Sequence, residues 1–293
     1  MAGSRFGVTL NGETIIGGCG MRMDPPTAYV FPAAYDRITI LKGPQHVRYG
    51  PGNSAGLVQF KRDPRIFDQP GADLYSSFTL GSFGRNDQAV NVLAGFPLGY
   101  FQASANRTQA DDYAGGDGRD VHSQYLRWST QAALGWTPDP QNLIELSTAF
   151  SDGEAAYADR TMDGTKFARE NLGLKFERRE ISPVVTSVEA QVYYNYIDHM
   201  MDNFTLRTPP GPPPGMRMLS NPDRRTIGGR AQLTLAPTDA TEFALGADAQ
   251  NNRHTVCGTT VWPPFARRTP HAAASFRVEF FLRSPMARLS IPR

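Results

Sequence analysis

The sequence predicts an all-β protein in which a small, irregular N-terminal domain precedes the first part of an antiparallel β-barrel of the outer-membrane kind. Three observations lead to this fold class. From about residue 72 onward, polar and apolar residues alternate with period 2. Many of these stretches reach the roughly 10 residues that a tilted membrane strand needs. Short turns also alternate with long polar loops along the chain.

The first 70 residues follow a different pattern from the rest. Strand-like pieces such as 37–41 are short and are interrupted by glycine and proline. We therefore expect residues 1–70 to form a separate small domain.

Nine alternating segments follow this domain, and no convincing amphipathic helix lies among them. Their predicted ranges are 72–83, 87–96, 100–109, 123–137, 143–151, 166–179, 185–204, 224–236 and 242–253. Soluble sheets favour strands of about 5 or 6 residues. The greater lengths here therefore indicate that residues 71–255 form part of a membrane barrel.

The connections between these segments carry a second signal. Tight turns are predicted at 97–99, 138–141, 180–183 and 237–240. Long polar loops, such as 111–122 and 201–223, lie between them. Outer-membrane barrels have this asymmetry, with short turns on the periplasmic side and long loops outside, whereas a soluble sandwich has no reason to show it.

Composition excludes several classes of protein. The formal net charge of +2 provides no basic stripe for nucleic acid. Two cysteines cannot build a disulfide framework. No apolar run is long enough for a transmembrane helix, and the mean hydropathy is −0.40. Barrel strands escape that last test, because their lipid-facing and lumen-facing residues alternate.

The two ends of the chain depart from these patterns. Residues 1–20 lack the features of a secretory signal, so we expect either a protein that is not exported or a missing beginning. Residues 256–293 are rich in arginine and proline and lose the earlier rhythm of strands and loops. We interpret them as an atypical tail, from a frameshifted or truncated end.

Two pairs of soft metal ligands stand far apart in the chain. Cys19 and Met23 lie in a glycine-rich loop, and His199 and Met201 lie near the end of the segment 185–204. Thiolate and thioether sulfur select monovalent copper over harder ions, and imidazole tolerates it. The four residues are therefore a candidate site for Cu(I).

The spacing of the second pair fits a shared ligand. Residues i and i+2 of a strand point to one face, so His199 and Met201 can meet one ion while Met200 faces away. If this strand rises from the short turn at 180–183, the pair lies near its outer end. A closed set of soft ligands suits metal capture rather than the activation of a water molecule.

A longer pattern then points to a family. Residues Tyr35–Gly50 (YDRITILKGPQHVRYG), followed by 52–58 (GNSAGLV), resemble the plug-domain signature of TonB-dependent outer-membrane receptors. The resemblance extends to about Arg253. It implies a plug that fills the lumen of a 22-stranded barrel, of which about nine strands are visible here.

Within that family, Cys19 through Val30 together with His199 and Met201 resemble the copper receptor branch. The resemblance implies a copper ion bound by Cys19 and Met23 on the plug and by His199 and Met201 on the barrel. It also implies an outer-membrane location, contact with outer-membrane lipid, and the TonB energy-transducing complex as partner. Transport would follow metal capture at the mouth, when the plug rearranges and the two ligand pairs separate.

Three alternatives remain open at the level of sequence. One is a receptor for siderophores, with an aromatic and arginine-lined pocket. Another is a nonfunctional remnant of a receptor. The third is a hydrolase, because residues 52–56 match the Gly-x-Ser-x-Gly pattern around Ser54. That pattern requires a strand, a sharp turn and a helix, and a β-like run follows it instead, so we do not expect an enzyme.

Overall fold

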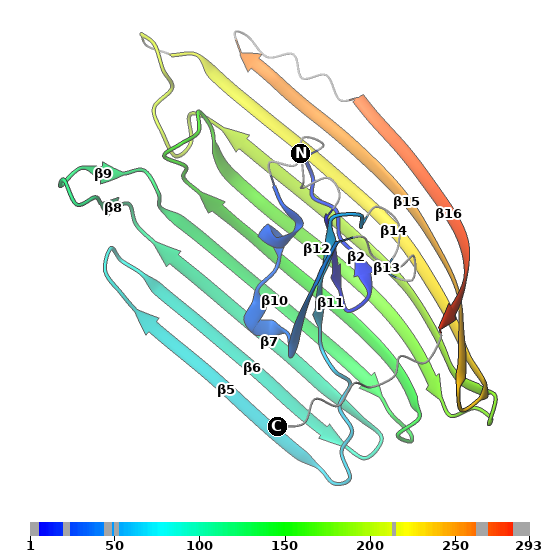
Figure 1. The fold of residues 1–293 in the computed structure, drawn as a ribbon. Helices are drawn as coiled ribbons and strands as arrows, with labels where there is room; N and C mark the ends of the chain where they lie inside the picture. Colours follow the sequence, from blue (N-terminus) through cyan, green and yellow to red (C-terminus); the bar gives the residue numbers. More distant parts are fainter. Residues whose placement is uncertain are drawn as a thin grey trace, which may run out of the picture.

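The structure is a computed structural model that describes residues 6–19, 24–43, 49, 53–212, 215–261 and 269–283, with side chains up to residue 256. Two sheets dominate these residues. The ten strands of the larger sheet form one curved layer, and the N-terminal elements lie against one of its faces (Figure 1).

The N-terminal domain is built on a four-stranded sheet with the order β2-β1-β4-β3. Its strands are β1 (Phe6–Leu10), β2 (Glu13–Thr14), β3 (Arg37–Lys42) and β4 (Gly56–Lys61). β1 runs parallel to β4, and the other two pairings are antiparallel. The segment predicted at 37–41 is β3.

Two single-turn 3-10 helices connect β2 to β3. They are η2 (Pro26–Tyr29) and η3 (Pro32–Ala34). Each has a proline in its first turn, where the missing N–H costs no hydrogen bond. Among the described residues, no helix is long and apolar enough to cross a membrane.

The large sheet pairs every strand antiparallel with its neighbours, in the order β16-β15-β14-β13-β12-β11-β10-β7-β6-β5. Its strands are β5 (Gly71–Leu80), β6 (Asn86–Phe96), β7 (Gly99–Ala110), β10 (Tyr125–Trp136), β11 (Asn142–Ala155), β12 (Asp163–Arg179), β13 (Val185–Asp202), β14 (Arg217–Thr238), β15 (Thr241–Val261) and β16 (Thr269–Arg283). The nine predicted strands are all present. A tenth, β16, lies in the tail where we expected no continuation of the pattern.

The connections have the predicted asymmetry. At one end of the sheet, the strands are joined by turns that span 97–98, 137–141, 180–184 and 239–240. At the other end lie the longer segments 111–124, 156–162 and 203–216. The first of these carries a small hairpin, β8 (Tyr113–Ala114) with β9 (Asp120–Val121). The last is shorter than predicted, because β14 begins at Arg217 rather than near residue 224.

The two faces of the large sheet differ in polarity. On β12, Leu172 and Leu174 are about half exposed, whereas Arg169 and Asn171, which precede them at odd-numbered positions on the other face, are buried. The exposed face is therefore apolar and the covered face polar. A soluble sheet has the opposite arrangement, and an outer-membrane barrel has this one.

Aromatic side chains follow the same division. Trp128 and Trp136 lie exposed toward opposite ends of β10, as expected for residues at the two membrane interfaces. Tyr193, by contrast, does not lie at an interface. It is 6% exposed on the covered face, and its hydroxyl accepts a hydrogen bond from Gln250 at 2.6 Å, so it belongs to the interior.

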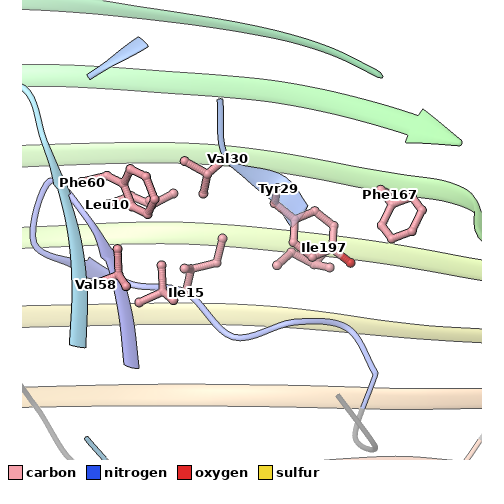
Figure 2. Packing of buried hydrophobic residues seen from close by; sticks show 9 residues of the cluster. Leu10, Ile15, Tyr29, Val30, Val58, Phe60, Phe167 and Ile197 are labelled. Carbon is pink, nitrogen blue, oxygen red and sulfur yellow. The ribbon is translucent and has the colours of Figure 1, made fainter. Parts of the chain in front are cut away.

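The N-terminal domain is attached to the sheet by a shared apolar cluster (Figure 2). Its members from the N-terminal domain are Val8, Leu10, Ile15, Tyr29, Val30, Val58 and Phe60. The sheet contributes Phe167 from β12 and Ile197 from β13, which lie close to Tyr29 in Figure 2. Burial of these side chains favours docking of the domain against β12 and β13.

Candidate metal centre

His199 and Met201 lie three and one residues before the end of β13, at the end of the sheet that carries the long loops. Both face the interior and are nearly inaccessible, with exposed fractions of 1% and 3%. Met200 between them is only half-buried. The alternation of a strand thus places the histidine and Met201 on one face, toward the N-terminal domain.

The hydrogen bonding of His199 leaves one ring nitrogen available. Nδ1 lies 3.0 Å from the carbonyl oxygen of Lys166 on β12. A carbonyl only accepts, so Nδ1 carries the proton and Nε2 keeps its lone pair. Nε2 is buried and has no hydrogen-bond partner among the described residues. Metal-binding histidines have this arrangement, in which one ring nitrogen is anchored and the other is a free donor.

Phe167 fixes the imidazole from a second direction. It lies opposite His199 in the register of β12 and β13, and the two ring centroids are 4.6 Å apart. The same phenyl ring lies 6.2 Å from that of Tyr29. The imidazole is therefore held between a backbone carbonyl and an aromatic ring.

Cys19 lies in the loop that follows β2 and is 7% exposed. The carboxylate of Asp24 shapes this loop from the plug side. It accepts hydrogen bonds from the backbone N–H of Gly18 at 2.6 Å and from that of Cys19 at 2.8 Å. The hydroxyl of Tyr29 donates a third at 2.5 Å. Burial and the adjacent Asp24 raise the pKa of Tyr29, so its phenol keeps the proton that it donates.

Gly18 brings this loop onto β13. A Cβ atom at Gly18 would lie 3.2 Å from the Cβ of His199 and 3.2 Å from the Cγ2 of Ile197. This spacing is tighter than ordinary van der Waals contact. The backbone next to Cys19 is therefore in direct contact with the strand that carries the imidazole.

The close approach leads to a first prediction. Replacing Gly18 with valine should push the loop away from β13, because three carbon atoms would enter a space that is tight for one. We expect faster alkylation of Cys19 by a thiol reagent, measured in a Cys257→Ser background. Gly116→Val is the control, because nothing lies within 4 Å of a Cβ there. Equal rates in the two variants would refute the contact.

The structure thus brings three of the four predicted ligands to one junction, where the Cys19 loop meets the strand of His199 and Met201. The fourth, Met23, lies outside the described residues. Sequence reasoning missed the residues that hold the ligands in place, namely Asp24, Phe167 and the carbonyl of Lys166. Asp24 stands beside Met23 in the motif, but a single acidic residue in a loop gives no signal of its own.

Below this junction, Glu13 of β2 enters a buried polar cluster on the sheet. The Nδ2 of Asn171 donates to its carboxylate at 2.7 Å, and the Nδ2 of Asn195 lies 3.4 Å away. Arg169 is also buried and donates to Asn195. Burial raises the pKa of Glu13 to about 7, although Arg169, the two amides and Arg62 oppose the rise.

Above the junction, a buried carboxylate joins the long loops. Asp163, at the start of β12, is fully inaccessible. Arg207 pairs with both of its oxygens, with Nε 2.7 Å from Oδ2. The Nε2 of His122 lies 2.9 Å from Oδ2, and the N–H of Tyr157 donates to Oδ1 at 2.9 Å. We call this cluster the loop clasp, because it joins the segments 111–124, 156–162 and 203–212 through His122, Tyr157 and Arg207.

A plug that docks inside a polar-faced, antiparallel sheet defines a class of outer-membrane receptor. Residues 1–57 match the family model of the TonB-dependent Receptor Plug Domain. The N-terminal part of the chain is therefore a plug domain of the TonB-dependent receptors, and part of the barrel fold of that class follows it.

The copper transporter OprC is a particular member of that class to which this chain is similar. Its solved structure is 46% identical in sequence, with a TM-score of 0.83. The match covers 88% of this chain and 40% of the transporter. This chain thus spans less than half the length of that relative.

More distant solved structures share the fold alone. A mutant of the ferric enterobactin receptor from Pseudomonas aeruginosa is 14% identical, with a TM-score of 0.69 over 97% of this chain and 48% of its own. The FrpB iron transporter from Neisseria meningitidis is 11% identical, with a TM-score of 0.63 over 97% and 54%. No curated protein matches this chain.

Proposed function

We propose that this chain is part of a TonB-dependent copper receptor of the outer membrane and that it captures copper between plug and barrel. The observation that carries the proposal is the buried, unpartnered Nε2 of His199 beside the loop of Cys19. Met201 shares the face of His199, and Met23 supplies the fourth ligand at a spacing of four residues from Cys19. Similarity to a copper transporter supports the choice of metal.

The ligand types favour the monovalent ion. A thiolate, two thioethers and an imidazole are soft or intermediate donors, which monovalent copper prefers to carboxylate or water. Copper is the cargo in this proposal, and the chain performs transport rather than catalysis. The TonB complex would supply the movement of the plug, and the apolar face of the sheet would contact outer-membrane lipid.

The geometry suggests how cargo would leave. Cys19 and Met23 belong to the plug, whereas His199 and Met201 belong to the barrel. A movement of the plug away from β13 would split the ligand set into two pairs. Each pair alone binds copper more weakly than the full set, so separation of the domains would release the ion.

Metal stoichiometry tests this proposal. The chain is refolded in detergent with Cu(I) under reducing conditions or with zinc, and bound metal is measured by mass spectrometry. We expect about one copper per chain in the parent and none in the Cys19→Ala, His199→Ala double variant. Met201→Leu should weaken binding, whereas Met200→Leu should not, because Met200 lies on the other face of β13. Equal copper retention by parent and double variant would refute the site.

One observation favours a second candidate, an iron-chelate receptor. A cavity of about 480 Å³ lies on the loop side of the plug, lined in part by Tyr125, Arg127, Tyr157 and Phe167. Aromatic and arginine side chains would suit an anionic chelate. However, Arg127 already donates to the carbonyl of Ala28 at 2.5 Å, and its guanidinium lies over the ring of Phe31. Binding of a ferric catecholate, without copper retention, would favour this candidate over the copper receptor.

A further inference from the structure

The loop of Cys19 is also held from the barrel side, by two residues of neighbouring strands. The Nε of Arg224 on β14 donates to the carbonyl of Gly17 at 2.9 Å. The Nε2 of His254 on β15 lies 2.7 Å from the carbonyl of Gly18 and donates to it. Arg224 and His254 are direct cross-strand partners in the register of β14 and β15. Two adjacent barrel side chains thus bind two consecutive carbonyls of the plug.

The N–H groups of the same loop are bound from the opposite side. Asp24 accepts from Gly18 and Cys19, as described above. The peptide groups around Gly18 therefore have their oxygens on barrel residues and their N–H groups on a plug residue. The backbone at Gly17 also packs closely against Asp24, because a Cβ atom there would lie 2.4 Å from the carbonyl oxygen of Asp24. This close packing restricts the conformation of the loop.

We propose that Arg224 and His254 are positioning residues for copper capture, which hold the Cys19 loop in register with His199. Asp24 preserves the shape of the loop, whereas the two barrel residues set its place. This inference rests on the proposed copper function, and it assigns to Arg224 and His254 the bonds that must break when plug and barrel ligands separate. Neither residue is one of the four proposed copper ligands.

Loss of the two barrel anchors should lower the copper affinity of the site. Losing an outer-shell partner of a metal ligand typically costs 10- to 100-fold in affinity. We expect the Arg224→Met, His254→Leu double variant to weaken Cu(I) binding by about 10- to 100-fold in a chelator competition, because Cys19 is no longer held beside His199. Arg224→Lys with His254→Gln keeps both donors and should recover most of the affinity.

Alkylation of Cys19 without metal tests the positioning separately from copper. In the Cys257→Ser background, the Arg224→Met, His254→Leu variant should react faster than the parent, and the Arg224→Lys, His254→Gln variant should react at nearly the parent rate. Arg225→Met is the matched control, because Arg225 is exposed on the other face of β14. Circular dichroism of each refolded variant confirms that the sheet is intact.

The outcomes separate the two proposals. If the parent binds copper and the variant lacking both donors binds it equally well, the positioning role is refuted and the copper site stands. If the parent binds no copper but the variant exposes Cys19, the copper function fails and the positioning of the loop stands. If neither copper affinity nor alkylation differs between that variant and Arg225→Met, the inference is overturned.

Discussion

Asp163→Ala should detach the long loops from one another while leaving the sheet folded. The substitution removes the carboxylate that Arg207, His122 and the backbone of Tyr157 share. Removing one partner of a buried ion pair costs about 3–5 kcal/mol, because the other charge is left without compensation. Arg207 keeps one-fifth of its side-chain surface exposed, so water can partly solvate its charge. We therefore expect the loops to lose about 3 kcal/mol of stability, the lower end of this range.

Hydrogen–deuterium exchange measures this effect. Amides of the segments 111–124 and 203–212 should exchange faster in Asp163→Ala, and those of β12 and β13 should keep their protection. Asp159→Ala is the control, since Asp159 is an exposed acidic residue in the segment 156–162, just before Asp163. Unchanged protection of both segments would show that the clasp does not hold the loops.

Docking of the plug should weaken as the pH rises from about 4.5 to about 7. Glu13 has a pKa of about 7 in the docked plug against an ordinary value of 4.5. Below 4.5 the carboxyl is protonated whether or not the plug is docked. Between the two values only the released plug loses its proton, so rising pH favours release. Across this range the free energy of docking becomes less favourable by about 3 kcal/mol, and above pH 7 this loss stays constant.

Exchange of the β1 and β4 amides at several pH values, corrected for intrinsic rates, tests this prediction. Protection should fall from pH 5 to pH 7 in the parent. In Glu13→Gln the fall should vanish, because the amide accepts from Asn171 but does not titrate. A parent whose corrected protection is independent of pH would contradict the shifted pKa of Glu13.

Most of the sheet was predictable, because its signal is local. The alternation of residues in β5–β7 and β10–β15 gave the number and order of those strands, and the prolines and glycines gave the turns. Two misses have physical causes. Pro222 lies within β14, opposite Val256, although proline usually marks a strand edge, so the predicted strand began too late. In the tail, the surrounding prolines and arginines hid the short alternating run 276–280, which belongs to β16.

The candidate site was predictable only in part. The i, i+2 spacing placed His199 and Met201 on one face, and the structure confirms that placement. The loop of Cys19 lies against the strand of His199 through contacts between residues about 180 positions apart, such as Gly18 and His199, and no local pattern encodes such contacts. The anchors Arg224 and His254 belong to neighbouring strands and act through backbone carbonyls of the plug. Such partners emerge only when the register of β14 and β15 is known.

The opposite polarity of the two faces determines which changes in chain length the protein tolerates. Insertion of a single residue in the middle of β12 would rotate every later side chain to the other face, sending Arg169 or Asn171 outward and leucines inward. Insertion of two residues would restore the faces and only displace the register. The segments 111–124 and 203–216 carry no such constraint outside the loop clasp. Length variation should therefore accumulate in the long loops and enter the strands only in pairs of residues.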